Sequence, residues 1–138
     1  MTTIVVGYVS RPEGRAALRV GVAEAKLRGA RLLVVNSTKG GQQVDVGDAA
    51  AVGEELDAIR QELAQTGVDF EVRELARGEE VSEDLISVAE ESDATFIVIG
   101  LRRRTPVGKL IMGSHAQRIL LDASCPVLAV KAGPEDEA

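Results

Sequence analysis

The chain has 138 residues, a length at which one domain commonly forms around a single hydrophobic core. Its formal net charge of −6 and its aromatic content of 2% argue against a surface that binds nucleic acid through cations and stacked bases. With one histidine and one cysteine, it lacks the ligands for a zinc site of these residue types. The opening MTTIVVGYVS predicts neither a signal peptide nor a membrane span, so we expect a cytoplasmic protein.

Five short runs rich in β-branched residues predict strands. They are TIVVGYV at 3–9, RLLVVNS at 31–37, VDFEVREL at 68–75, TFIVIG at 95–100 and PVLAVK at 126–131. Segments with helical periodicity separate the strands and predict four helices. The apolar face of the first contains Leu18, Val22 and Ala25, that of the second Val52, Leu56, Ile59 and Leu63, and that of the third Val81, Leu85, Val88 and Ala89. The fourth helix, HAQRILLDA, is short. Gly29 and Gly67 predict where the first two helices stop. The glycine-rich residues 39–50 predict a loop.

Strands that alternate with helices predict a parallel sheet covered on both faces, which agrees with the unbroken apolar runs TIVV, LLVV and FIVI. We therefore predict an α/β fold: a five-stranded, mostly parallel sheet in a Rossmann-like, doubly wound sandwich over residues 1–132. The run at 68–75 carries charges between its apolar residues, so we expect it at a sheet edge. The acidic residues 133–138 predict a disordered tail.

One long loop carries most of the functional signal. GLRRRTPVGKLIMGS, from Gly100 to Ser114, holds three arginines and a lysine without any carboxylate, and it is longer than most connections between strand and helix. If the first and fourth strands are neighbours, this loop meets GYVSRPEG where doubly wound sheets bind ligands. Its far end starts a helix whose free N–H groups attract anions. The combination predicts a phosphate site.

Simpler explanations stay open for the same residues. Ser114 with Gln117 matches a capping box, in which the serine serves only its own helix. The arginines fit a solvated basic rim, and Gly100 fits the end of a strand. His115 is better described as a polar helix residue than as a proton shuttle.

Known nucleotide and hydrolase motifs do not account for the loop. A P-loop requires Ser or Thr after its Gly-Lys pair, whereas Leu110 follows Gly108 and Lys109. No G-x-S-x-G or H-E-x-x-H motif is present in the sequence. An enzyme is therefore not the favoured interpretation, and any ATP hydrolysis is expected to be slow.

Three segments together resemble the universal stress protein family, small α/β proteins that are usually dimers. They are IVVGYVSRPEGRAAL, DATFIVIG and GLRRRTPVGKLIMGSHAQRILLDASCPVLAVK, so that the resemblance runs from Thr3 to about Lys131. Nucleotide-binding members carry G-x2-G-x9-G-[ST]. Gly100, Gly113 and Ser114 match this motif in register, whereas Arg103 replaces the second glycine. Val9 stands where members that bind ATP commonly have an Asp near the adenosine.

The resemblance implies a stress-response module that binds an adenine nucleotide, ATP or AMP, between the first and fourth strands. Gly100, Gly113 and Ser114 would hold the phosphates, while Val9, Val35 and Leu101 would line the base pocket. The nucleotide-binding residues expected on this basis are Gly7, Tyr8, Val9, Val35, Gly100, Leu101, Arg102, Arg103, Arg104, Gly113, Ser114 and His115. A homodimer paired through the last strand is also implied. The alternative is a nucleotide-free dimer that docks partner proteins, which Val9 and Arg103 favour.

Overall fold

A computed structural model describes residues 2–37, 46–75, 80–101 and 113–136, with only the backbone for 46–50. Within these residues, strands alternate with helices along the chain. The strands are β1 (Thr3–Gly7), β2 (Arg31–Ser37), β3 (Phe70–Leu75), β4 (Phe96–Leu101) and β5 (Val127–Lys131). The helices are α1 (Pro12–Arg28), α2 (Val46–Ala64), α3 (Val81–Glu91) and α4 (Ser114–Asp122), followed by the 3-10 turn η1 (Pro134–Asp136).

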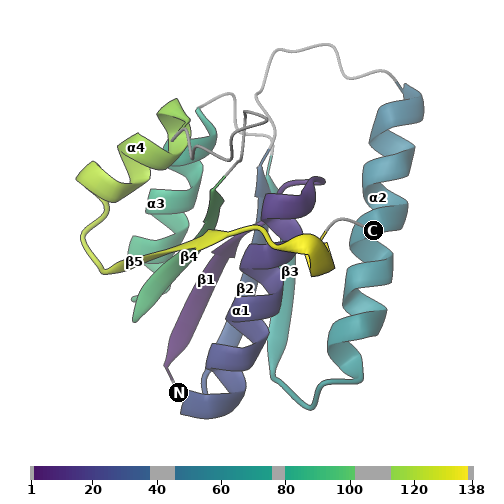
Figure 1. Cartoon of the computed structure of the whole chain (residues 1–138), viewed down its shortest axis with the longest axis horizontal. Coiled ribbons are helices and arrows are strands. Elements are labelled where there is room, and N and C mark those ends of the chain that lie inside the picture. Colours follow the sequence, from purple (N-terminus) through teal and green to yellow (C-terminus); the bar gives the residue numbers. More distant parts are fainter. Residues whose placement is uncertain (1, 38–45, 76–79, 102–112, 137–138) are drawn as a thin grey trace.

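The five strands form one sheet in the order β3-β2-β1-β4-β5, and every neighbouring pair is parallel (Figure 1). The chain winds from β1 outward to β3, then crosses β1 and continues outward through β4 to β5. The direction of winding therefore reverses between β1 and β4, where such folds leave a crevice at the carboxyl ends of the strands. The predicted doubly wound α/β fold is confirmed, as is the edge position of β3.

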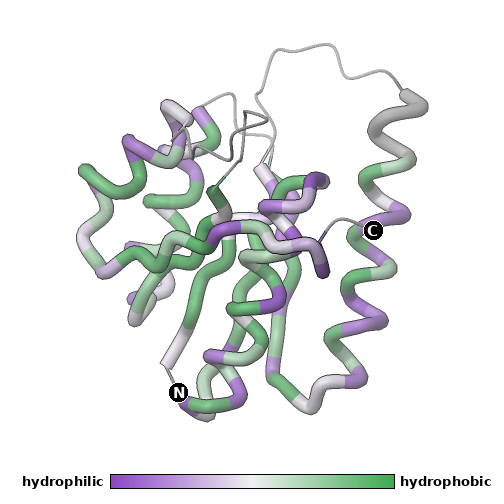
Figure 2. The backbone as a smooth tube through the Cα atoms, in the orientation of Figure 1, coloured by the Kyte–Doolittle hydropathy of each residue, from purple (hydrophilic) through white to green (hydrophobic). Residues whose placement is uncertain are grey.

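Side chains that alternate along the strands build two cores, one on each face of the sheet. On one face, Ile4 and Val6 of β1 pack with apolar residues of α1 and α2. On the other, Val5 of β1 packs with Val35 of β2 and with residues of α3 and α4. Figure 1 shows the two helix pairs on opposite sides of the sheet. Because both faces are covered, the central strands β1 and β4 are apolar almost throughout, whereas the helices carry hydrophilic stripes (Figure 2).

Local signals in the sequence set the ends of α1. Pro12 occupies its first turn, where the N–H that proline lacks would have no partner in the helix. The helix stops at Gly29, whose φ of 61° is left-handed and whose N–H bonds to the carbonyl of Ala25. Gly67, after α2, is also left-handed, with a φ of 77°. No helix among the described residues is long and apolar enough to cross a membrane.

The structure differs from the sequence prediction at two places. Helix α2 begins at Val46, so the loop predicted for 39–50 is wrong for its last five residues, while 39–45 lie outside the described residues. The predicted disordered tail contains the turn η1, in which Asp136 is only 4% exposed. Arg19 of α1 donates two hydrogen bonds of 3.0 Å to the Asp136 carboxylate. This charge-assisted contact offsets the entropy lost when the segment is ordered.

Candidate functional site

Two adjoining hollows lie where the carboxyl ends of β1 and β4 meet the start of α4. The first, which we call the apolar cavity, has a volume of about 130 Å³. The second, which we call the outer hollow, has a volume of about 270 Å³ and lies beside the starts of α1 and α4. Val9, Gly100, His115 and Ala116 line both, so the two hollows form one continuous crevice. The crevice lies at the point where the winding of the sheet reverses.

The apolar cavity is built from the sheet face that α3 and α4 cover. Val35 of β2 and Ile99 of β4 belong to the core on that face, as does Leu85 of α3. Gly7, at the end of β1, also lines this cavity. A Cβ atom at Gly7 would lie 2.9 Å from Cδ2 of Leu85, so the glycine lets α3 approach the sheet closely. The result is a hydrophobic space that opens toward the outer hollow.

The outer hollow has a more polar lining than the apolar cavity and lies between two helix N-termini. Arg11, an exposed residue, is the N-cap of α1, and Gly113 is the N-cap of α4. Neither cap residue donates or accepts a side-chain hydrogen bond at its helix start. Ser114 is the first residue inside α4 and not its cap, so the capping-box explanation of this serine is wrong. Arg11 and Glu13, of opposite charge, both line this space, and the positive ends of two helix dipoles beside it favour an anion.

Gly100 has a clear packing role. A Cβ atom there would lie only 1.9 Å from the carbonyl oxygen of Glu13, in the first turn of α1. Gly14 is equally constrained, since its Cβ would lie 1.8 Å from the carbonyl oxygen of Val9. Gly113, in contrast, has no atom within 4 Å of the Cβ position. Gly100 therefore lets the start of α1 lie against β4, and Gly14 lets it lie against Val9 in the connection after β1.

The structure brings together the predicted site residues that it describes. Those lining one or both hollows are Gly7, Tyr8, Val9, Val35, Gly100, Leu101, Gly113, Ser114 and His115. Leu101 lines the outer hollow but not the apolar cavity, which differs from its expected place beside a base. Arg102, Arg103 and Arg104 lie outside the described residues.

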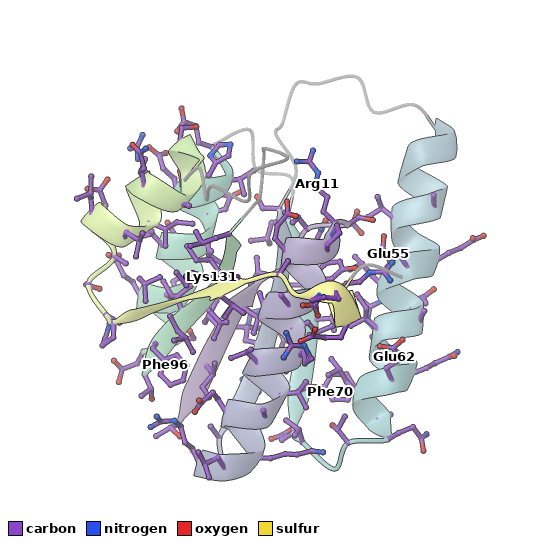
Figure 3. All side chains as sticks on the ribbon, in the orientation of Figure 1. Arg11, Glu55, Glu62, Phe70, Phe96 and Lys131 are labelled. Atoms are coloured by element: carbon purple, nitrogen blue, oxygen red, sulfur yellow. The ribbon has the colours of Figure 1, made fainter. Side chains whose placement is uncertain are left out.

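Tyr8 contributes to the crevice only in part, because its ring belongs to the core between the sheet and the helices α1 and α2. Its hydroxyl donates a hydrogen bond to Glu55 of α2, and Ser10 donates to the other oxygen of that carboxylate at 2.5 Å. Figure 3 shows Glu55 on the side of α2 toward α1. Burial raises the pKa of the Tyr8 hydroxyl well above its ordinary value, and the Glu55 hydrogen bond raises it further. Tyr8 is therefore a neutral structural link between β1 and α2.

Three polar residues near the crevice were missed by the sequence reasoning. Arg11 is the one cation in GYVSRPEG, a loop that was already expected at the site. Ser37 follows Val35 by two residues, so strand alternation places both on the same face. Asp84 follows Val81 by three residues, on the apolar side of the predicted helix. The sequence analysis singled out none of these three residues.

Comparisons with known proteins agree with this architecture. A sequence model of the universal stress protein family matches residues 1–131. The chain is 48% identical over 128 residues to a universal stress protein of Mycolicibacterium smegmatis, covering 93% of this chain and 96% of that relative. A solved universal stress protein from Archaeoglobus fulgidus superimposes with a TM-score of 0.80 at 36% identity, over 95% of this chain and 99% of the other. A universal stress protein from the same organism, in complex with dAMP, gives a TM-score of 0.75 at 32% identity, over 95% and 98%.

Proposed function

We propose that this protein binds an adenine nucleotide, ATP or AMP, in the crevice between β1 and β4. The premise is that the chain belongs to the universal stress protein family. The observation that carries this proposal is the junction of an apolar cavity with a more polar hollow at two helix N-termini. A flat heterocycle requires the first environment and a phosphate requires the second. The 32% identical protein of A. fulgidus solved with dAMP supports the same ligand class.

Each part of the nucleotide has a counterpart in the crevice. Val9, Val35 and Ile99 offer apolar surface to the base. The hydroxyl of Ser114 and the first N–H groups of α4 face the phosphate end, and Arg11 supplies a guanidinium that can bind two phosphate oxygens. In the sequence Arg102, Arg103 and Arg104 follow Leu101 directly, and they stay part of the proposed nucleotide-binding set.

Calorimetry with AMP, ATP and adenosine tests the proposal. We expect Arg11→Ala to weaken ATP binding by about tenfold, because a charge-assisted hydrogen bond is lost, and to leave adenosine binding nearly unchanged. Lys26→Ala is the matched control, since it removes one exposed positive charge from the other end of the same helix. Purified protein that carries no nucleotide and gives no heat with AMP or ATP contradicts the proposal.

The alternative function is a nucleotide-free dimer that docks partner proteins, and both functions include a dimer that the exposed edge of the sheet at β5 supports. Among the described strands β5 pairs only with β4, and Leu128, its second residue, is 37% exposed. An unpaired strand edge with an exposed leucine suits pairing with a second copy of the chain. We propose a homodimer through β5 with or without nucleotide.

Sedimentation at micromolar concentration tests this dimer. Leu128→Lys is expected to convert it to a monomer, because the charge would be buried at the centre of the contact. Leu121→Lys, at a leucine of α4 that is 82% exposed, is expected to leave the dimer intact. A wild-type monomer contradicts the proposal. A stable dimer that binds no nucleotide supports the alternative function.

A further inference from the structure

We propose, as an extension that rests on the proposed function, that Ser37 and Asp84 form a hydrogen-bond acceptor in the wall of the apolar cavity. This pair selects a base that presents an amino group over one that presents a carbonyl at the same place. The inference concerns the choice among nucleotides, which the family resemblance leaves open for this chain because Val9 occupies the position of the expected acidic residue.

Ser37 is the last residue of β2 and lines the apolar cavity. Its hydroxyl donates a hydrogen bond of 2.5 Å to Oδ2 of Asp84. A carboxylate has no proton to donate, so the single proton of the serine is committed to Asp84. The Ser37 oxygen therefore faces the cavity as an acceptor.

Asp84 lies in the first turn of α3, and its side chain is completely buried, with an exposed fraction of 0%. Its second oxygen, Oδ1, has no hydrogen-bond partner within the described part of the chain. Ser82, two residues before Asp84, is equally buried, and its hydroxyl also has no partner within the described part of the chain. It does not line the apolar cavity. The positive end of the α3 dipole lies beside Asp84, which is in the first turn of that helix. As a carboxylate Asp84 can only accept, so it holds the Ser37 proton and leaves Ser37 an acceptor toward a ligand.

The remaining described lining of the apolar cavity gives this acceptor few competitors. The hydroxyl of Tyr8 is bonded to Glu55, so it is not directed to a ligand. His115 lies where the cavity joins the outer hollow. An exocyclic amino group at the inner end of the cavity would donate to Ser37, whereas a carbonyl would set two acceptors against each other. The cavity is thus suited to adenine and unsuited to hypoxanthine or guanine.

AMP and IMP are the probes, because their bases differ by an amino group and a carbonyl at one position. We expect the wild-type protein to bind AMP about tenfold more tightly than IMP in calorimetry, since the wrong base leaves an unpaired polar group. Asp84→Asn keeps the shape of the side chain but lets its NH2 donate to Ser37, which frees the serine proton for a carbonyl. The preference for AMP is expected to disappear or reverse.

Ser37→Ala provides a second variant in case Asp84→Asn does not fold. It is expected to weaken AMP binding by about tenfold and to leave IMP binding within about twofold of wild type. Ser10→Ala is the matched control, because Ser10 also donates a 2.5 Å hydrogen bond to a carboxylate, that of Glu55, yet does not line the apolar cavity. Its AMP preference should equal that of the wild type. Thermal unfolding checks that each variant is folded.

The outcomes separate the two proposals. Equal binding of AMP and IMP by the wild type overturns the acceptor role of Ser37 and Asp84 while the nucleotide-binding function stands. A tenfold preference that survives in Ser37→Ala overturns it as well. If neither nucleotide binds, the proposed function and this inference both fail.

Discussion

The molecule contains two contrasting cavities on opposite faces of the sheet. The apolar cavity, of about 130 Å³, lies at the carboxyl ends of β1 and β4. A larger one, of about 470 Å³, lies between α1 and α2, and we call it the interhelical cavity. Figure 3 shows Glu55 and Glu62 on the side of α2 toward α1, where they line this cavity. Several of its polar groups bond to one another: Tyr8 donates to Glu55, and Arg19 pairs with Asp136 at 3.0 Å.

This difference teaches that size alone does not identify a functional site. The polar groups we have described in the interhelical cavity already have partners within the protein, so a ligand would have to displace them. At the crevice, an acceptor at Ser37 and two helix starts without side-chain caps are available to a ligand. The smaller cavity also lies where the winding of the sheet reverses. There the chain leaves β1 and β4 toward helices on opposite faces of the sheet, which leaves space for a ligand.

The largest effect is expected at Gly100, where the crevice and the fold depend on the same close contact. Gly100→Ala should lower the free energy of unfolding by about 3 kcal/mol, because its Cβ would overlap the carbonyl oxygen of Glu13. Gly53→Ala, in α2, is the control: no atom lies within 4 Å of its Cβ position. This control should gain about 0.5–1 kcal/mol from helix propensity. Denaturant unfolding measures both, and equal stabilities would show that the contact at Gly100 is not tight.

Filling the cavities one at a time tests the comparison directly. Ala116→Phe, in the wall of the apolar cavity, should reduce AMP affinity by about a hundredfold, because the ring would occupy the space of the base. Ala58→Phe makes the same change in the wall of the interhelical cavity and should alter AMP affinity by less than about twofold. Calorimetry gives both values. The reverse pattern would place the ligand between α1 and α2.

Removing the Tyr8 hydroxyl should affect stability and not binding. Tyr8→Phe removes one of the two described hydroxyl groups that donate to Glu55, leaving Ser10, and it should lower the free energy of unfolding by about 1 kcal/mol.

The raised pKa of Tyr8 also predicts a pH effect, because at high pH the unfolded tyrosine loses its proton before the folded one. Wild-type stability should therefore fall as the pH rises above the ordinary tyrosine pKa of 10.0. Denaturation at several alkaline pH values would show a shallower fall in Tyr8→Phe, and an identical fall would contradict this assignment.

The smallest effect is expected at the end of the chain. Asp136→Asn weakens the pairing with Arg19, whose side chain is 47% exposed, so the loss should be less than about 1 kcal/mol. The Arg19 hydrogen bond holds the pKa of Asp136 below its usual range. The stabilisation is therefore present at neutral pH and is lost as the pH falls through the folded pKa of this carboxyl. Acid unfolding of wild type and variant measures this loss. Unfolding that begins at the same pH in both would show that the pairing contributes nothing to stability.

The sequence by itself determined the architecture and the place of the crevice. Continuous apolar runs between helical segments permit little except a parallel sheet with both faces covered, and Gly29 marks a helix end through local backbone chemistry. The adjacency of β1 and β4 also followed, because the winding of such sheets reverses in few ways. Gly100 was expected there on this ground, and Gly7 and Val35 on the family resemblance; all three line the apolar cavity.

Only the tertiary structure decided which way the polar side chains point and what they meet. Ser37 and Asp84 are 47 residues apart, as are Tyr8 and Glu55, and Arg19 lies 117 residues from Asp136. Periodicity assigns a residue to a face of one element, but it does not say which polar group from another element lies opposite. That pairing depends on how the helices pack on the sheet, which is set by the sum of many apolar contacts and not by a local signal.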